Sequence, residues 1–139
     1  MKTPNYEETR AEPLTTDALV ADRVGQLIGR AIQRQIWFLF LDANQVQLPL
    51  VIPVGELPAR PDALVGALAE RLAAVVQAEA ADSVIVVIER YAHPDLTASD
   101  REWAKCLHDA LDERGVPVRG VLLSHSSGVR WMAQDDCRF

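Results

Sequence analysis

Residues 83–100 read SVIVVIERYAHPDLTASD, and this stretch decides the fold. Its first seven residues are mostly apolar without alternation, which is typical of a strand that is buried on both faces of a sheet. His93 and Pro94 prevent the strand from running on into a helix, because the residue before a proline avoids helical geometry. Thr97 and Asp100 then have the spacing of a capping box, which predicts the start of a helix. A buried strand followed so closely by a helix indicates an α/β protein.

Similar signals extend this pattern in both directions along the chain. Each further element is marked by an apolar stripe at helical spacing or by a run of strand-forming residues. We expect helices over residues 17–34, 63–80 and 98–114, and strands over residues 36–41, 46–54, 83–89, 118–124 and 129–132. The order α-β-β-α-β-α-β-β predicts a single α/β domain with a mixed sheet of about five strands and three helices, in two or three layers. The third and fourth strands should be parallel neighbours, because a helix connects them through a right-handed crossover.

The two ends of the chain lack such patterns. Residues 1–13 carry two prolines and three glutamates without an apolar period, and we expect a flexible N-terminal tail there. Residues 14–133 form the predicted domain, and residues 134–139 form a C-terminal tail. At 139 residues, the whole chain is short enough for one domain.

Charge and composition argue against several classes of function. The chain has a formal net charge of −6 and a sequence pI of about 5.0. A surface of that sign repels phosphate groups, so we expect neither nucleic-acid binding nor binding to anionic membranes. The longest apolar run, residues 36–41, is too short to span a bilayer.

Cysteine usage predicts the cellular compartment. Cys106 and Cys137 are the two cysteines, and no CxxC motif occurs. This usage favours a cytoplasmic protein with reduced thiols, and Cys106 is expected to be a buried thiol inside a helix. Arginine greatly outnumbers lysine, a bias associated with bacteria whose genes are rich in G and C.

Two prolines predict which strand lies at the edge of the sheet. Pro49 and Pro53 have the same parity in the strand over residues 46–54, so both missing N–H donors fall on one side of that strand. That side pairs poorly, and we expect an edge strand that the prolines protect from aggregation. Together with Trp131 on the last strand, Pro49 and Pro53 mark a candidate interaction surface.

Polar side chains gather where the third and fourth predicted strands end. Glu89, His93 and Asp95 lie at the end of the third strand, and His125 follows the fourth. In an open α/β sheet, ligands bind outside the carboxyl ends of the strands. Two imidazoles with a carboxylate from Glu89, Asp95 or Asp100 would form a minimal catalytic zinc site with water in its open position. The alternative is that both histidines are exposed loop residues without a ligand.

Other catalytic motifs find no support in the sequence. Residues 124–128, SHSSG, place a serine beside a histidine but lack the GxSxG pattern of a nucleophile elbow. They predict a hairpin turn instead. No phosphate-binding P-loop, GxGxxG or zinc-knuckle spacing occurs.

Two stretches carry a resemblance to a group of uncharacterised proteins. Residues 34–50, RQIWFLFLDANQVQLPL, and residues 114–136, RGVPVRGVLLSHSSGVRWMAQDD, resemble those of actinobacterial α/β proteins of unknown function. The resemblance covers most of the chain after the N-terminal tail. It implies an α/β fold, and no activity comes with it.

A more distant resemblance is to the RadC and JAMM metallopeptidase-like fold, over residues 27–42 and 91–116. That family implies a zinc site and a glutamate that acts as general base. Here Gln33 and Gln35 stand where the glutamate is sought, and Tyr91 replaces the first histidine, so that only His93 remains. Glutamine is not a base, and tyrosine is a poor zinc ligand at neutral pH. The resemblance therefore implies a member that has lost its metal.

No complete catalytic set can be assembled from these residues. We therefore expect a non-catalytic cytosolic protein without a cofactor, which acts by self-association, for example as a homodimer, or by binding a protein partner. One alternative is a zinc-dependent hydrolase that uses His93, His125 and one carboxylate. A third reading is a small-ligand binder at the same carboxyl ends of the third and fourth strands.

Overall fold

The structure is a computed structural model that describes residues 12–29, 31, 33–92 and 95–132. Within these residues the elements are, in chain order, α2 (Asp17–Ile28), β1 (Gln35–Leu41), β2 (Gln47–Gly55), α3 (Leu64–Ala78), β3 (Ser83–Glu89), α4 (Ala98–Glu113), β4 (Val118–His125) and β5 (Gly128–Trp131). This order confirms the predicted single α/β domain with three helices and a five-stranded mixed sheet. Most of the two predicted tails lies outside the described residues.

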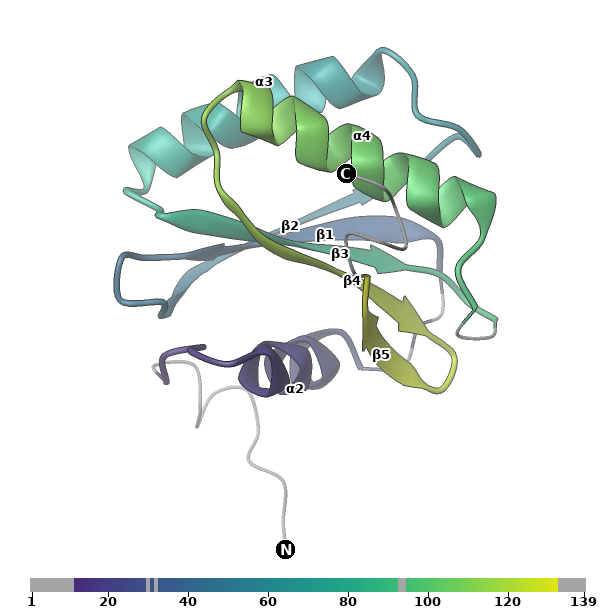
Figure 1. Ribbon diagram of the computed structural model, residues 1–139, viewed down its shortest axis with the longest axis horizontal. Coiled ribbons are helices and arrows are strands. Elements are labelled where there is room, and N and C mark those ends of the chain that lie inside the picture. The colour runs from purple at the N-terminus through teal and green to yellow at the C-terminus, as the bar shows by residue number, and fades with distance from the viewer. Residues whose placement is uncertain (1–11, 30, 32, 93–94, 133–139) are drawn as a thin grey trace, which may run out of the picture.

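The five strands form one sheet in the order β2-β1-β3-β4-β5. β3 and β4 are parallel, as a crossover through α4 predicts, and the other three neighbouring pairs are antiparallel. The sheet lies between α3 and α4 on one face and α2 on the other, so the domain has three layers (Figure 1). β1 and β3 are central strands, and their residues are buried almost throughout.

β2 is an edge strand, as its two prolines predict. It pairs with β1 in a register that joins Trp37 to Pro53 and Leu39 to Val51. Pro49 and Pro53 are exposed. Proline has no N–H to donate, so this edge offers an incomplete set of partners to another strand.

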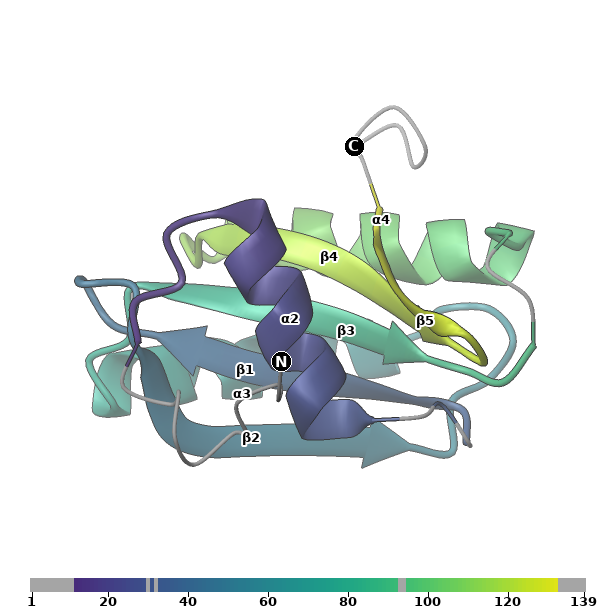
Figure 2. The same ribbon diagram turned by 90° about the horizontal axis from the view of Figure 1, so that it is seen from below.

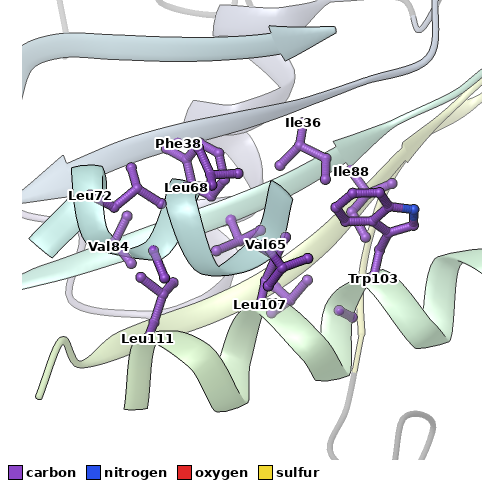
Figure 3. Close-up of a cluster of buried hydrophobic side chains, with 14 of the residues drawn as sticks. Ile36, Phe38, Val65, Leu68, Leu72, Val84, Ile88, Trp103, Leu107 and Leu111 are labelled. Atoms are coloured by element: carbon purple, nitrogen blue, oxygen red, sulfur yellow. The ribbon is translucent and has the colours of Figure 1, made fainter. Parts of the chain in front are cut away.

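The larger core lies between the sheet and the pair α3 and α4. Every second residue of β1, including Ile36 and Phe38, points toward these helices, because successive side chains of a strand alternate between faces. Leu72 on α3 and Leu107 on α4 pack against them (Figure 3). Fully burying one such side chain stabilises the fold by about 1.5–3 kcal/mol. These contacts fix both helices on this face.

A smaller apolar cluster lies under α2, the one helix on the other face within the described residues (Figure 2). Val20 and Val24 of the helix pack against Leu39 and Ile85. These belong to the same strands, β1 and β3, whose alternate residues face the larger core. Burial on both faces explains why β1 and β3 read as continuous apolar runs rather than as alternating ones.

The first helix is shorter than its sequence pattern predicts. α2 ends at Ile28 rather than at residue 34, because Gly29 follows with φ 67°, a left-handed conformation that ends the helix. The predicted continuation was wrong because a glycine at C′ was read as part of the helix. Gly25, the glycine inside α2, faces open space, since a Cβ at this position would meet no atom within 4 Å.

The other two helices begin close to their predicted positions. At α4, Thr97 and Asp100 form the predicted capping box, which satisfies two backbone N–H groups. At α3 the cap residue is Ala63, while Asp62 accepts a hydrogen bond from the Leu64 N–H at 2.9 Å. The carboxylate thus caps the turn from one position earlier.

Cys106 is exposed, so the prediction of a buried thiol was wrong. The buried stripe of α4 follows Trp103, Leu107 and Leu111. Cys106 lies one residue before Leu107, and a step of one residue turns the side chain by about 100° around the helix. The Cys106 thiol therefore points away from the buried stripe of α4.

No helix among the described residues is long and apolar enough to cross a membrane.

Candidate functional site

The ends of β3 and β4 meet at one rim of the sheet, where the candidate site residues fall. The register pairs Glu89, the last residue of β3, with Ser124 near the end of β4. β1 starts at this rim, because Gln35 pairs with Glu89 across the antiparallel ladder. We call this end of the sheet the carboxyl rim.

Glu89 is buried, with 2% of its surface exposed, on the face that α2 covers. Its carboxylate accepts hydrogen bonds from Gln35 Nε2 at 2.8 Å, from Trp37 Nε1 at 2.7 Å and from the backbone N–H of Gln33 at 3.2 Å. Hydrogen bonds to an ionised carboxylate are stronger than neutral ones. Glu89 therefore anchors the start of β1, and Gln33 two residues before it, to the end of β3.

Ser124 lies beside Glu89 in the neighbouring strand and is fully buried. Its Oγ has no hydrogen-bond partner in the described part of the chain. A buried polar group without a partner is uncommon in folded proteins, and it lowers the free energy of unfolding because it has lost its hydrogen bonds to water. This hydroxyl leaves the polar network on the α2 face incomplete.

His125 follows Ser124 and therefore points to the opposite face of the sheet. It is buried, and its Nδ1 accepts a hydrogen bond from the backbone N–H of Ser127 at 3.2 Å. Burial lowers the pKa of His125, and the positive charges of Arg90 and Arg130 lower it further. The ring is therefore neutral at pH 7, with its proton on Nε2, since Nδ1 must act as acceptor.

Arg90 forms the main charged contact of the rim. Its Nε and Nη2 both bond the Asp100 carboxylate, at 2.9 and 2.8 Å to Oδ2, and Nη2 also donates to the backbone oxygen of Asp95 at 2.6 Å. Both members of this ion pair are buried. Asp100 was predicted as a helix cap and as one of the candidate zinc ligands, and the sequence pattern carries no signal for its pairing with Arg90.

Tyr91 and Ala92 continue directly from Arg90 and turn outward. The Tyr91 side chain is 61% exposed. Ala92 has φ 105°, a conformation that non-glycine residues rarely adopt, and its carbonyl accepts bonds from the Ser126 N–H at 3.0 Å and Oγ at 2.7 Å. We call residues 90–92 the Tyr91 segment. It is fixed at both ends, by Arg90 and by Ser126.

The predicted zinc ligands are not brought together within the described residues. Glu89 and His125 lie on opposite faces of the sheet, and Asp95 is exposed. No group of three His, Cys, Asp or Glu side chains that could hold a metal ion occurs in the part of the chain that the structure describes. His93 lies outside the described residues.

The predicted interaction residues fall in two separate places. Pro49 and Pro53 are exposed on β2 at one edge of the sheet. Trp131 is half-buried at the other edge, where its Nε1 donates to the backbone oxygen of Asp17 at 3.2 Å. Its indole ring fills the space above Gly120, so that a Cβ there would lie 2.0 Å from a ring carbon.

A comparison with protein-family models places most of the chain in a family. The family model described as "Domain of unknown function (DUF4192)" matches residues 38–138, which is most of the chain. The match begins inside β1, so it leaves α2 outside. No curated protein matches the chain. The match is consistent with the resemblance to uncharacterised proteins, whereas the resemblance to the RadC and JAMM fold finds no support.

Proposed function

The chain belongs to the DUF4192 family of domains of unknown function, and we propose that it is a non-catalytic cytosolic binding domain that contacts another protein chain through the Tyr91 segment. The contact surface in this proposal is the exposed side chain of Tyr91 at the carboxyl rim. The proposed partner is a second copy of the chain or a different protein. An actinobacterial source, which the excess of arginine suggests, belongs to the same proposal.

The exposure of Tyr91 on a fixed backbone carries this proposal. Tyrosine is enriched among the residues that dominate binding energy at protein interfaces. The Arg90 side chain holds one end of the segment through Asp100, and Ser126 holds Ala92 through two hydrogen bonds. A segment that is already ordered loses little conformational entropy when a partner binds. Strained backbone such as that of Ala92 tends to occur at functional sites.

The contacts of the polar groups at the carboxyl rim support binding rather than catalysis. Glu89 accepts three hydrogen bonds and Asp100 holds the Arg90 guanidinium, so both carboxylates are engaged within the fold. The His125 Nδ1 receives the Ser127 N–H. A general base needs a free acceptor directed at a substrate, and these groups are occupied by the protein itself.

A photo-crosslinking experiment tests the proposal. p-Benzoylphenylalanine replaces Tyr91 in one variant and, in the control, Leu64, which is the other exposed large apolar residue among those that the structure describes. Each variant is irradiated as purified protein and in the cells that express it. We expect a discrete adduct from position 91 and none from position 64, and an adduct of twice the chain mass identifies a second copy. No adduct at position 91, or equal adducts at both positions, would contradict the proposal.

A further inference from the structure

β4 is only partly covered at its outer edge, at the end of the sheet opposite the carboxyl rim. β5 pairs with β4 only over Leu122–His125. The register with β3 passes from Val118 directly to Gly120, so Arg119 has no partner residue in β3 or β5 among the described residues. A hollow of about 270 Å³ opens there, and we call it the edge hollow. Its lining includes Asp17 of α2 and His108 of α4, so it spans the edge between the two helical layers.

Two opposite charges lie side by side in the edge hollow. Arg119 Nη2 donates to Asp17 Oδ1 at 3.0 Å. The Asp17 side chain is 73% exposed and that of Arg119 is 23% exposed. No second partner of either side chain is found in the described part of the chain, apart from the Trp131 ring. A guanidinium has five N–H donors and a carboxylate has two acceptor oxygens, so both groups can bind a further molecule.

Trp131 holds this pair of charges in place. The Arg119 guanidinium lies 5.5 Å from the centre of the Trp131 ring, within the range of a cation–π interaction. The same indole donates to the Asp17 backbone oxygen and rests on Gly120. The charged groups are therefore positioned before any ligand arrives, which reduces the entropy lost on binding.

We propose that the edge hollow binds a small zwitterion, a free α-amino acid. The ligand carboxylate pairs with Arg119, whose planar donors fit a carboxylate, and the ligand ammonium pairs with Asp17. An aliphatic side chain then packs against Val118 and Met132, which line the same hollow. Asp17 repels a simple anion and Arg119 repels a simple cation, so a ligand with both charges is favoured over either. This site lies at the opposite end of the sheet from the Tyr91 segment and does not depend on it.

The Trp131 indole gives the proposal a direct readout. The chain has three tryptophans, and the variant Trp131→Phe assigns the Trp131 indole signal in a ¹H–¹⁵N NMR spectrum. Titration with L-leucine is expected to shift this signal in a saturable way. L-Leucinamide lacks the carboxylate and 4-methylpentanoate lacks the ammonium. Each is expected to bind about tenfold more weakly or worse, because one charge-assisted pair is missing.

Matched variants separate the site from general effects of charge. Asp17→Asn and Arg119→Gln each remove one charge of the hollow and are expected to weaken L-leucine binding about tenfold or more. Glu102→Gln removes the acidic member of a different surface pair, Arg60–Glu102, none of whose residues line the edge hollow, and is expected to leave binding unchanged. The proposal is overturned if L-leucine causes no saturable shift, if either analogue binds as tightly as L-leucine, or if Asp17→Asn binds like the unmodified chain.

Discussion

The two faces of the sheet are packed in different ways. The face under α3 and α4 is covered by two helices and is filled by apolar side chains, with buried charges only at the carboxyl rim. The face under α2 has one helix and a smaller apolar cluster, and buried polar groups lie within it. Arg23 bonds Gln47 there, and Gln35 bonds Glu89. Apolar packing thus dominates one face, while specific polar contacts position the helix and the strand ends on the other.

The two faces also differ in whether their buried polar groups are hydrogen-bonded. On the α2 face, Gln47 Nε2 and Ser124 Oγ are buried, and neither has a hydrogen-bond partner among the described residues. Each such group opposes folding by roughly 1–3 kcal/mol. We therefore expect the α2 face to be the less stable of the two, and local opening to begin there.

Truncating neighbouring leucines on β4 gives the largest expected effect and the sharpest test of this comparison. Leu123 points to the α3 and α4 face and Leu122 to the α2 face, and both are fully buried. Leu123→Ala is expected to lower the free energy of unfolding by about 2–5 kcal/mol. Leu122→Ala is expected to lower it less, because a face covered by one helix can collapse around the cavity. Urea unfolding measures both, and a larger loss for Leu122→Ala would reverse the comparison.

Removing the carboxylate of Glu89 probes the polar contacts of the α2 face. Glu89→Ala leaves Gln35 Nε2 and Trp37 Nε1 buried without their acceptor, which is expected to lower the free energy of unfolding by about 1–3 kcal/mol. Glu89→Gln keeps one acceptor oxygen and should lose less. Chemical denaturation followed by circular dichroism measures the difference. Equal stability of Glu89→Ala and the unmodified chain would mean that these bonds do not position β1.

Two glycines should respond with opposite signs to the same substitution. Gly120→Ala forces the Trp131 ring away from β4 and is expected to cost about 1–3 kcal/mol. Gly25→Ala adds a methyl group where no atom lies within 4 Å and is expected to stabilise α2 by up to about 1 kcal/mol. Thermal unfolding of both variants measures the shifts. A stabilised Gly120→Ala would show that the indole has room to move.

The smallest expected effect is a change in the pH dependence of stability caused by His125, a buried polar residue at the rim of the apolar face. Its pKa is lowered in the folded state, first by burial and then by Arg90 and Arg130. At a pH near or below about 6.5, the ordinary pKa of histidine, His125 therefore binds a proton more readily in the unfolded chain than in the folded one. The free energy of unfolding decreases on acidification for this reason, and it recovers as the pH rises. His125→Asn keeps an acceptor for the Ser127 N–H and does not titrate. A pH series of unfolding curves should be less steep for this variant, and identical slopes would contradict the expectation.

The order of the elements could be predicted from sequence because local patterns specify it. β3 matches its predicted range, since an unbroken apolar run ends at Glu89 and a proline follows. The predictions from sequence were wrong where one residue type is compatible with two structural roles. Gly29 fits a helical stripe in the sequence, yet its positive φ ends α2. Cys106 was correctly placed inside a helix, but its apolar character led to the wrong expectation that it is buried, whereas the buried stripe of α4 does not include it.

The candidate site could be located but not assembled from the sequence. Glu89 is the last residue of its strand, as predicted, and His125, which was predicted to follow the fourth strand, is the last residue of β4. That Glu89 bonds Trp37, 52 residues away, depends on the register between β1 and β3, which no local pattern specifies. The same holds for Arg90 and Asp100, which meet only after α4 has packed on the sheet.

The prolines of β2 also limit how copies of this chain can assemble through their sheets. An open filament needs two free edges on every molecule, so that each copy can pair with one neighbour on each side. Pro49 and Pro53 weaken one of these edges, which leaves the β4 and β5 side as the usable one. Two copies that pair through that side consume both usable edges. Sheet-to-sheet association of this domain should therefore stop at a closed two-fold pair and should not propagate into fibres.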